Sequence, residues 1–132
     1  MAKKPAALED AETIARYVFF SDEVRANGTP RPKLFEPDRQ HECSVFRTDG
    51  LSKPEVQRIG DEVVSPNYGR LPYGHCDLFV AQIRNEVRMR VEADEPPDHH
   101  ACIRGYEQDK AAWKLQAARL SQQAEPIVRF VR

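Results

Sequence analysis

The residues best suited to metal or nucleophilic chemistry fall into three short segments of the chain. All four histidines and all three cysteines lie in His41-Glu42-Cys43, His75-Cys76 and His99-His100-Ala101-Cys102. Imidazole and thiolate are the usual ligands of zinc, which takes four ligands in a tetrahedral array. If the fold brings the three segments together, the sequence predicts a zinc-binding domain.

The spacing within these segments does not match a known zinc motif. The chain has no Cys-x-x-Cys pair and no His-x-x-x-His pair, which are the intervals that zinc sites commonly use. Buried cysteines behave as small apolar residues, so a second interpretation places the thiols in the core and the histidines in loops. On that interpretation the protein needs no cofactor, and zinc is an alternative only.

A third interpretation makes Cys76 a nucleophile. His75 stands beside it, and Asp77 would cap a helix that begins directly afterwards. A helix N-terminus and a neighbouring imidazole both favour the thiolate form of a cysteine. Such a site usually has a third group that orients the base, and no Asp or Asn stands out for that role.

Residues 100–104 offer a different chemistry, directed at phosphate. In an extended strand His100, Cys102 and Arg104 share one face. Histidine serves as a general acid or base, and arginine binds phosphate through charged hydrogen bonds. With Arg47, these residues would form the catalytic site of a small enzyme acting on a nucleotide or on RNA phosphate. The hypothesis requires the three side chains to converge.

Arg47 lies in a predicted strand, Ser44-Val45-Phe46-Arg47-Thr48, just before a turn and a capped helix. This stretch resembles ADP-ribosyltransferase folds, in which an arginine or histidine on such a strand holds NAD. The resemblance covers only these few residues, and the rest of that family's pattern is absent. An exposed position on the solvent face of the strand explains Arg47 as well.

Composition and charge are typical of one small domain. The chain has 132 residues, of which 40% are apolar and 31% are charged. With 20 basic and 21 acidic side chains, it has no overall attraction to nucleic acid or to an anionic membrane. No apolar run suits a signal peptide or a membrane span, and an odd number of cysteines argues against a disulfide framework. We expect a cytoplasmic protein, with a flexible tail over residues 1–6 and one domain over residues 7–132.

Hydrophobic periodicity and capping signals predict the secondary structure. Helices are expected over residues 7–20, 53–64, 77–87 and 109–124, and strands over residues 43–48, 88–93 and 100–106. The clearest local signal is Ser52-Lys53-Pro54-Glu55, a capping box with proline in the first turn. The predicted fold class is α+β: a single small domain whose short, mostly antiparallel sheet is packed by about four helices on one face.

Residues 26–40 are rich in proline and predict an extended, stiff connection. Long connections in compact domains are often functional, and a preorganised surface binds with a smaller entropic cost. Arg31, Lys33 and Phe35 are therefore the predicted binding residues. Because no metal, nucleotide or phosphate-loop motif is complete, the sequence favours a small binding or accessory module that acts with a protein partner. The phosphate enzyme and the zinc domain are the alternatives.

Overall fold

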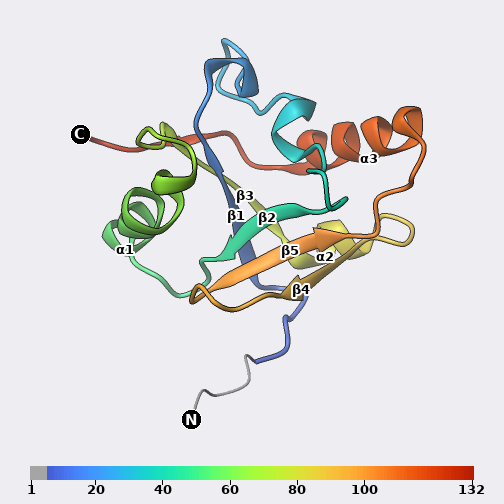
Figure 1. The fold of residues 1–132 in the computed structure, drawn as a ribbon, viewed down its shortest axis with the longest axis horizontal. Coiled ribbons are helices and arrows are strands. Elements are labelled where there is room, and N and C mark those ends of the chain that lie inside the picture. The colour runs from blue at the N-terminus through green and yellow to red at the C-terminus, as the bar shows by residue number, and fades with distance from the viewer. Residues whose placement is uncertain (1–5) are drawn as a thin grey trace.

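A computed structural model describes residues 6–132 (Figure 1), so the predicted tail lies outside the described residues except for Ala6. In the described part of the chain, six strands form one antiparallel sheet in the order β4-β5-β2-β1-β3-β6. The strands are β1 (Thr13–Val18), β2 (Cys43–Arg47), β3 (Gly74–Phe79), β4 (Arg90–Ala93), β5 (His100–Arg104) and β6 (Val128–Arg129). The α-helices are α1 (Lys53–Ile59), α2 (Val80–Arg84) and α3 (Lys110–Gln123).

Shorter helical turns complete the chain. A π-helical turn over Gly60–Val64 and a 3-10 turn over Ser65–Asn67 extend α1. Two further 3-10 turns, Ser21–Glu23 and Pro32–Phe35, lie in the connection between β1 and β2. None of the helices in residues 6–132 is long and apolar enough to cross a membrane.

The predicted fold class is wrong, since a six-stranded sheet with three short α-helices replaces a short sheet packed by about four helices. Residues 7–20 were predicted to form a helix, but they contain strand β1. Ile14, Ala15, Tyr17 and Val18 are all buried, although successive residues of a strand point to opposite faces. A strand covered on both faces has no polar side, so it shows no alternation in sequence.

The predicted helix over residues 77–87 is also wrong in its first part. The chain there belongs to β3, in which buried Cys76 and Leu78 alternate with partly exposed His75 and Asp77. This period of two is that of a strand with one face in the core. Asp77 is therefore a strand residue and caps no helix, and α2 begins only at Val80.

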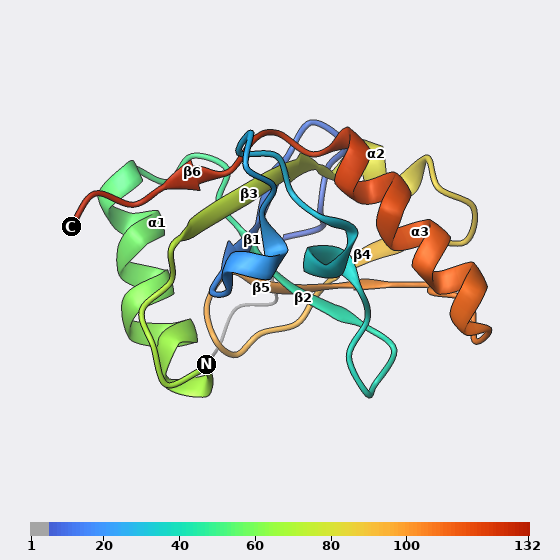
Figure 2. The same ribbon diagram turned by 90° about the horizontal axis from the view of Figure 1, so that it is seen from above.

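Helical segments cover both faces of the sheet, which corrects the prediction that they lie on one. Figure 2 shows α1 and α3 on opposite sides of the strands. On the face that we call the α3 face, a large core joins Ile14, Val45, Leu78, Ile103, Leu34, Phe35, Ala117 and Leu120. On the opposite face, the α1 face, a smaller core joins Tyr17, Phe19, Phe46, Val56 and Ile59.

Several local predictions are confirmed. Strand β5 occupies His100–Arg104 and pairs antiparallel with β4, as expected. The capping box is formed, with the Ser52 hydroxyl accepting a hydrogen bond from the Glu55 amide and the Glu55 carboxylate accepting one from the Ser52 amide. Helix α3 begins after Asp109, whose carboxylate accepts a hydrogen bond from the Ala112 amide.

The proline-rich connection is not an extended surface. Its 3-10 turn places Leu34 and Phe35 in the core of the α3 face, where both are fully buried. Arg31 stays exposed, and Lys33 forms an exposed ion pair with Asp22. Of the three predicted binding residues, the structure therefore leaves Arg31 and Lys33 accessible and places Phe35 out of reach of a partner.

Replacing Phe35 by alanine should destabilise the protein by about 3–5 kcal/mol, because it removes a fully buried aromatic ring and leaves a cavity. Lys33→Ala is the matched control from the same turn and should leave the urea midpoint unchanged, since its ion pair is exposed. Urea denaturation followed by circular dichroism measures both. A Phe35→Ala variant as stable as Lys33→Ala would contradict the placement of this turn.

Candidate functional site: a cavity at Arg16

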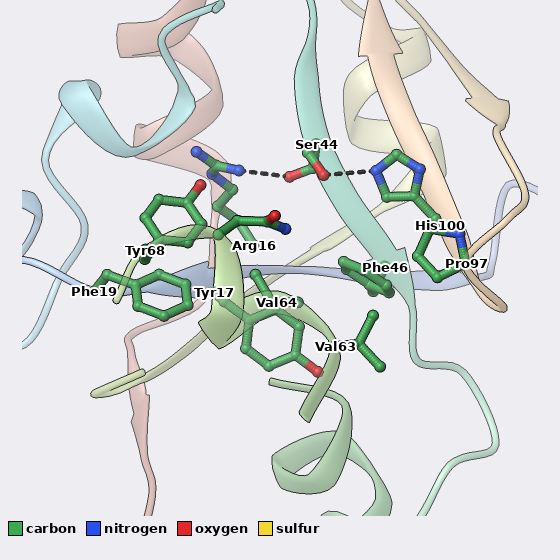
Figure 3. A pocket seen from close by; sticks show the side chains of 11 residues that line it. Arg16, Tyr17, Phe19, Ser44, Phe46, Val63, Val64, Tyr68, Pro97 and His100 are labelled. Carbon is green, nitrogen blue, oxygen red and sulfur yellow. Dashed lines mark hydrogen bonds between the residues drawn. The ribbon is translucent and has the colours of Figure 1, made fainter. Parts of the chain in front are cut away.

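A cavity of about 510 Å³ opens on the α1 face. Its walls come from β1, β2, β5, the end of the helical segment that follows α1, and the loop before β5 (Figure 3). The lining residues are Arg16, Tyr17, Phe19, Ser44, Phe46, Val63, Val64, Asn67, Tyr68, Pro97 and His100. The π-helical turn brings the adjacent residues Val63 and Val64 to the same cavity, and such turns are frequent at functional sites.

The cavity exists because β1 and β2 separate. Only Ile14 and Ala15 of β1 pair with β2, whereas all six residues of β1 pair with β3. Beyond Ala15, the edge of β1 that faces β2 has no strand partner. Arg16 pairs with Cys76 and so starts from the α3 face, but its side chain passes into the gap between the two strands and lines the cavity. A break in the middle of the sheet thus opens a hollow lined by side chains of both strands.

Arg16 ties three segments together. Its Nε donates to the Leu34 carbonyl oxygen at 3.1 Å, and its Nη1 donates to the Ser44 carbonyl oxygen at 2.8 Å. Within residues 6–132 it forms no ion pair, and its Nη2 makes no hydrogen bond. No fully buried side-chain nitrogen or oxygen of a described residue lacks a partner, so Nη2 is not fully buried, and Arg16 is one of the residues that line the cavity.

His100 and Ser44 form a hydrogen-bonded row beside Arg16 (Figure 3). The Ser44 Oγ lies 2.6 Å from His100 Nε2, and His100 Nδ1 lies 2.8 Å from the Asp94 carbonyl oxygen. A carbonyl oxygen only accepts hydrogen bonds, so in the neutral ring Nδ1 carries the proton and Nε2 accepts from the Ser44 hydroxyl. An Asp94 carboxylate oxygen lies 3.3 Å from the same Nδ1. This pairing of hydroxyl and imidazole is the one that activates serine nucleophiles.

Arg104 shares the α1 face with His100 but is occupied by carboxylates. Its Nε donates to Glu42 at 2.8 Å, its Nη1 donates to Glu92 at 3.3 Å, and its Nη2 lies 3.8 Å from Asp94. These three acids neutralise the guanidinium, so it is not free to bind a phosphate.

Arg47 lies on the opposite face. It pairs across the strands with Ile14, a residue of the α3-face core, and directly opposed residues of a sheet point to the same side. Its guanidinium forms a bidentate ion pair with Glu12. His100, Arg104 and Arg47 therefore do not converge. A cavity of about 340 Å³ does lie at Arg47, but Glu9, Glu12 and Asp49 line it, and these carboxylates would repel the phosphates of NAD.

The three histidine and cysteine segments do not form one site. Cys43 and Cys76 are buried in the core of the α3 face, whereas the strand register puts His75, His100 and Cys102 on the α1 face. In the described residues, one group of potential ligands lies close enough to hold a metal, and it joins Asp94 to His100 and Cys102.

Cys76 is not placed as a nucleophile. Burial is the main reason that its pKa rises to about 12, and the nearby carboxylates of Asp77 and Glu125 raise it further. Its Sγ donates to the Glu125 carbonyl oxygen at 3.2 Å. His75 points away from it and pairs with Asp77 at 2.7 Å.

Sequence reasoning found His100 but missed Arg16, Ser44 and Tyr68. One signal was present, because Arg16 is the only charged residue in the apolar run from Ile14 to Phe20. A lone arginine in such a run has to find partners inside the fold.

The raised pKa predicts a slow reaction of Cys76 with iodoacetamide in the native protein. At pH 8 a pKa of about 12 leaves roughly a thousandfold less thiolate than a free cysteine has. Peptide mass spectrometry should show Cys76 unmodified in buffer and modified in urea. Comparable labelling in both conditions would contradict its burial.

Comparison of the chain with protein-family models, with curated proteins and with solved structures gave no match in any of the three.

Proposed function

We propose that the protein binds a small organic anion in the cavity at Arg16. The guanidinium would hold a phosphate or carboxylate group, and the aromatic wall would hold an apolar or planar body. The observation that supports this most strongly is a partly buried guanidinium that lines a cavity and has no carboxylate partner among the described residues.

The positive charge of Arg16 is the reason to expect an anionic ligand. Arginine stays protonated in proteins, and a charge removed from water is costly unless it is paired. The guanidinium groups of Arg47, Arg84, Arg104 and Arg132 each pair with a carboxylate. Arg16 has two carbonyl oxygens instead, which carry only partial charge, so an anion in the cavity would complete its environment.

Glu23 does not supply the missing counter-ion. Its buried carboxylate accepts hydrogen bonds from the amides of Phe19 and Phe20 at 2.9 and 3.0 Å. It attracts the Arg16 charge without contacting it. The Arg16 guanidinium is therefore left without a carboxylate in direct contact, and an anionic ligand could take that position.

The lining of the cavity divides into a polar and an apolar part. Ser44 and His100 stand in a row with Arg16 (Figure 3) and form the polar part of the wall together with it. Phe19 and Tyr68 are stacked with ring centroids 4.1 Å apart and form part of the apolar wall. The volume lies within the range of small-molecule sites, which usually combine an apolar lining with a few polar groups.

This proposal keeps part of the phosphate-enzyme hypothesis and changes its residues. His100 stays, and Arg16 takes the place of Arg47 and Arg104. The accessory module that acts with a protein partner stays a prediction, for which Arg31 and Lys33 are the exposed residues.

Binding should be measured by isothermal titration calorimetry with phenyl phosphate, benzoate and AMP, and with phenol as the neutral control. We expect at least one anion to bind and phenol not to bind. Arg16→Lys should weaken binding at least tenfold, because lysine cannot serve two carbonyl oxygens and an anion in the same geometry. Arg47→Lys, on the opposite face, is the matched control and should bind like the wild type.

A Val64→Trp variant, which fills the cavity from the helical segment, provides a second test if Arg16→Lys does not fold. It should abolish binding while the circular dichroism spectrum is retained. The proposal is wrong if none of the three anions binds at millimolar concentration, or if the Val64→Trp variant binds as the wild type does.

A second candidate function is acyl or phosphoryl transfer at Ser44, which the 2.6 Å contact with His100 favours. An aryl fluorophosphonate should then form a bond between its phosphorus and Ser44 Oγ, with loss of fluoride and transfer of the hydroxyl proton to His100. Intact mass spectrometry would show the adduct, and Ser44→Ala should abolish it. Labelling elsewhere, or none, would exclude this function.

A further inference from the structure

We propose that Asp94, His100 and Cys102 bind one zinc ion at the edge of the cavity. We call these residues the β4–β5 cluster, because His100 and Cys102 belong to β5 and Asp94 directly follows β4. Their donor atoms all lie within 4.8 Å of one another. The site is separate from Arg16 and does not depend on the anion proposal.

The separations in the β4–β5 cluster are those of tetrahedral zinc ligands. Asp94 Oδ2 lies 3.3 Å from His100 Nδ1 and 3.5 Å from Cys102 Sγ. Zinc bonds of about 2.0 Å to nitrogen and oxygen and about 2.3 Å to sulfur, at tetrahedral angles, put ligand atoms about 3.3–3.5 Å apart. The two edges that meet at Asp94 Oδ2 therefore match a zinc site, and the third edge, from His100 Nδ1 to Cys102 Sγ, is within 4.8 Å. Zinc at Nδ1 would replace the present contact of Nδ1 with the Asp94 carbonyl oxygen, so that carbonyl group has to turn aside.

Strand pairing holds the three ligands in place. His100 and Cys102 are two residues apart on β5 and so share the α1 face. Glu92 pairs with Cys102, and the Asp94 amide donates to the His100 carbonyl oxygen at 2.9 Å. Asp94 is thereby fixed beside the other two ligands, and a rigid scaffold of this kind favours metal binding.

Ser44 would act as a second partner of the metal-bound histidine. Zinc at Nδ1 leaves the proton on Nε2, so the hydrogen bond would reverse and Nε2 would donate to the Ser44 Oγ, 2.6 Å away. Ligating histidines usually donate their second ring N–H in this way, which fixes the orientation of the ring.

The chemistry of the donors points to zinc rather than to magnesium or calcium. A thiolate ligand selects soft or borderline cations, and magnesium and calcium prefer oxygen ligands only. One thiolate and one carboxylate would balance the charge of Zn²⁺. Three protein ligands leave one position open for water or an anion, as in catalytic zinc sites. The partly exposed side chain of Asp94 gives the ion a path from solvent.

This ligand set differs from the one that the sequence suggested. Of the three histidine and cysteine segments, only the third contributes, through His100 and Cys102. Its acidic partner, Asp94, follows a different strand, so no local motif could reveal it.

Zinc binding should be measured on the full chain, treated with chelator, dialysed and then titrated with zinc chloride in a calorimeter. We expect one ion per chain, and inductively coupled plasma mass spectrometry should find one equivalent retained after gel filtration. Cobalt in place of zinc should give a thiolate-to-metal charge-transfer band. Cys102→Ser should lose the bound ion and the charge-transfer band. Cys43→Ser and Cys76→Ser are the matched controls, because these cysteines are also buried, and they should keep the ion and the band.

Asp94→Asn gives a further test that leaves the core unchanged, because Asp94 is partly exposed. It should weaken zinc binding at least tenfold while the circular dichroism spectrum stays that of the wild type. The proposal is overturned if the wild-type chain binds no stoichiometric zinc, if Cys43→Ser loses the ion as Cys102→Ser does, or if Asp94→Asn binds like the wild type. Repeating the anion titration with chelator present separates the failure of this proposal from failure of the proposed function.

Discussion

The arrangement of the α1 face depends on the bridge that Arg16 makes across a break in the sheet. After Ala15, β1 no longer pairs with β2, and backbone groups left without partners inside a protein are costly. Arg16 donates to the carbonyl oxygens of Leu34 and Ser44 and so bridges the break with a side chain. One side chain therefore stabilises the fold and also supplies the free donor that makes the cavity suitable for an anion.

His100 connects the two proposals, since each of its ring nitrogens serves one of them. Nε2 meets the Ser44 hydroxyl in the cavity wall, and Nδ1 faces Asp94 in the β4–β5 cluster. An anion at Arg16 and a zinc ion at the cluster would thus lie on either side of one imidazole. Binding of either ligand would alter the hydrogen bond between His100 and Ser44 and so affect binding of the other.

Much of the secondary structure could be predicted where its cause is local. The capping box at Ser52, the helix that begins after Asp109 and the strand at His100–Arg104 depend on neighbours in the chain, and all three were predicted. Strand β1 was missed because burial on both faces removes the alternation that marks a strand. The role of Arg16 was missed because its partners lie 18 and 28 residues away in sequence. His75 and Cys76 looked like one site, yet adjacent strand residues point to opposite faces.

The most direct test of the account is the side-chain signal of Arg16 in a ¹⁵N-labelled protein. Because its Nε–H is bonded to the Leu34 carbonyl oxygen, this proton should exchange slowly with water and give a resolved cross-peak, assigned by its loss in Arg16→Lys. Titration with an anion that binds, such as phenyl phosphate, should shift the Nε–H cross-peak of Arg16. The Nε–H cross-peak of Arg47 should not move. A cross-peak of Arg16 that does not move at saturating anion would contradict the claim that its guanidinium is the ligand-binding group.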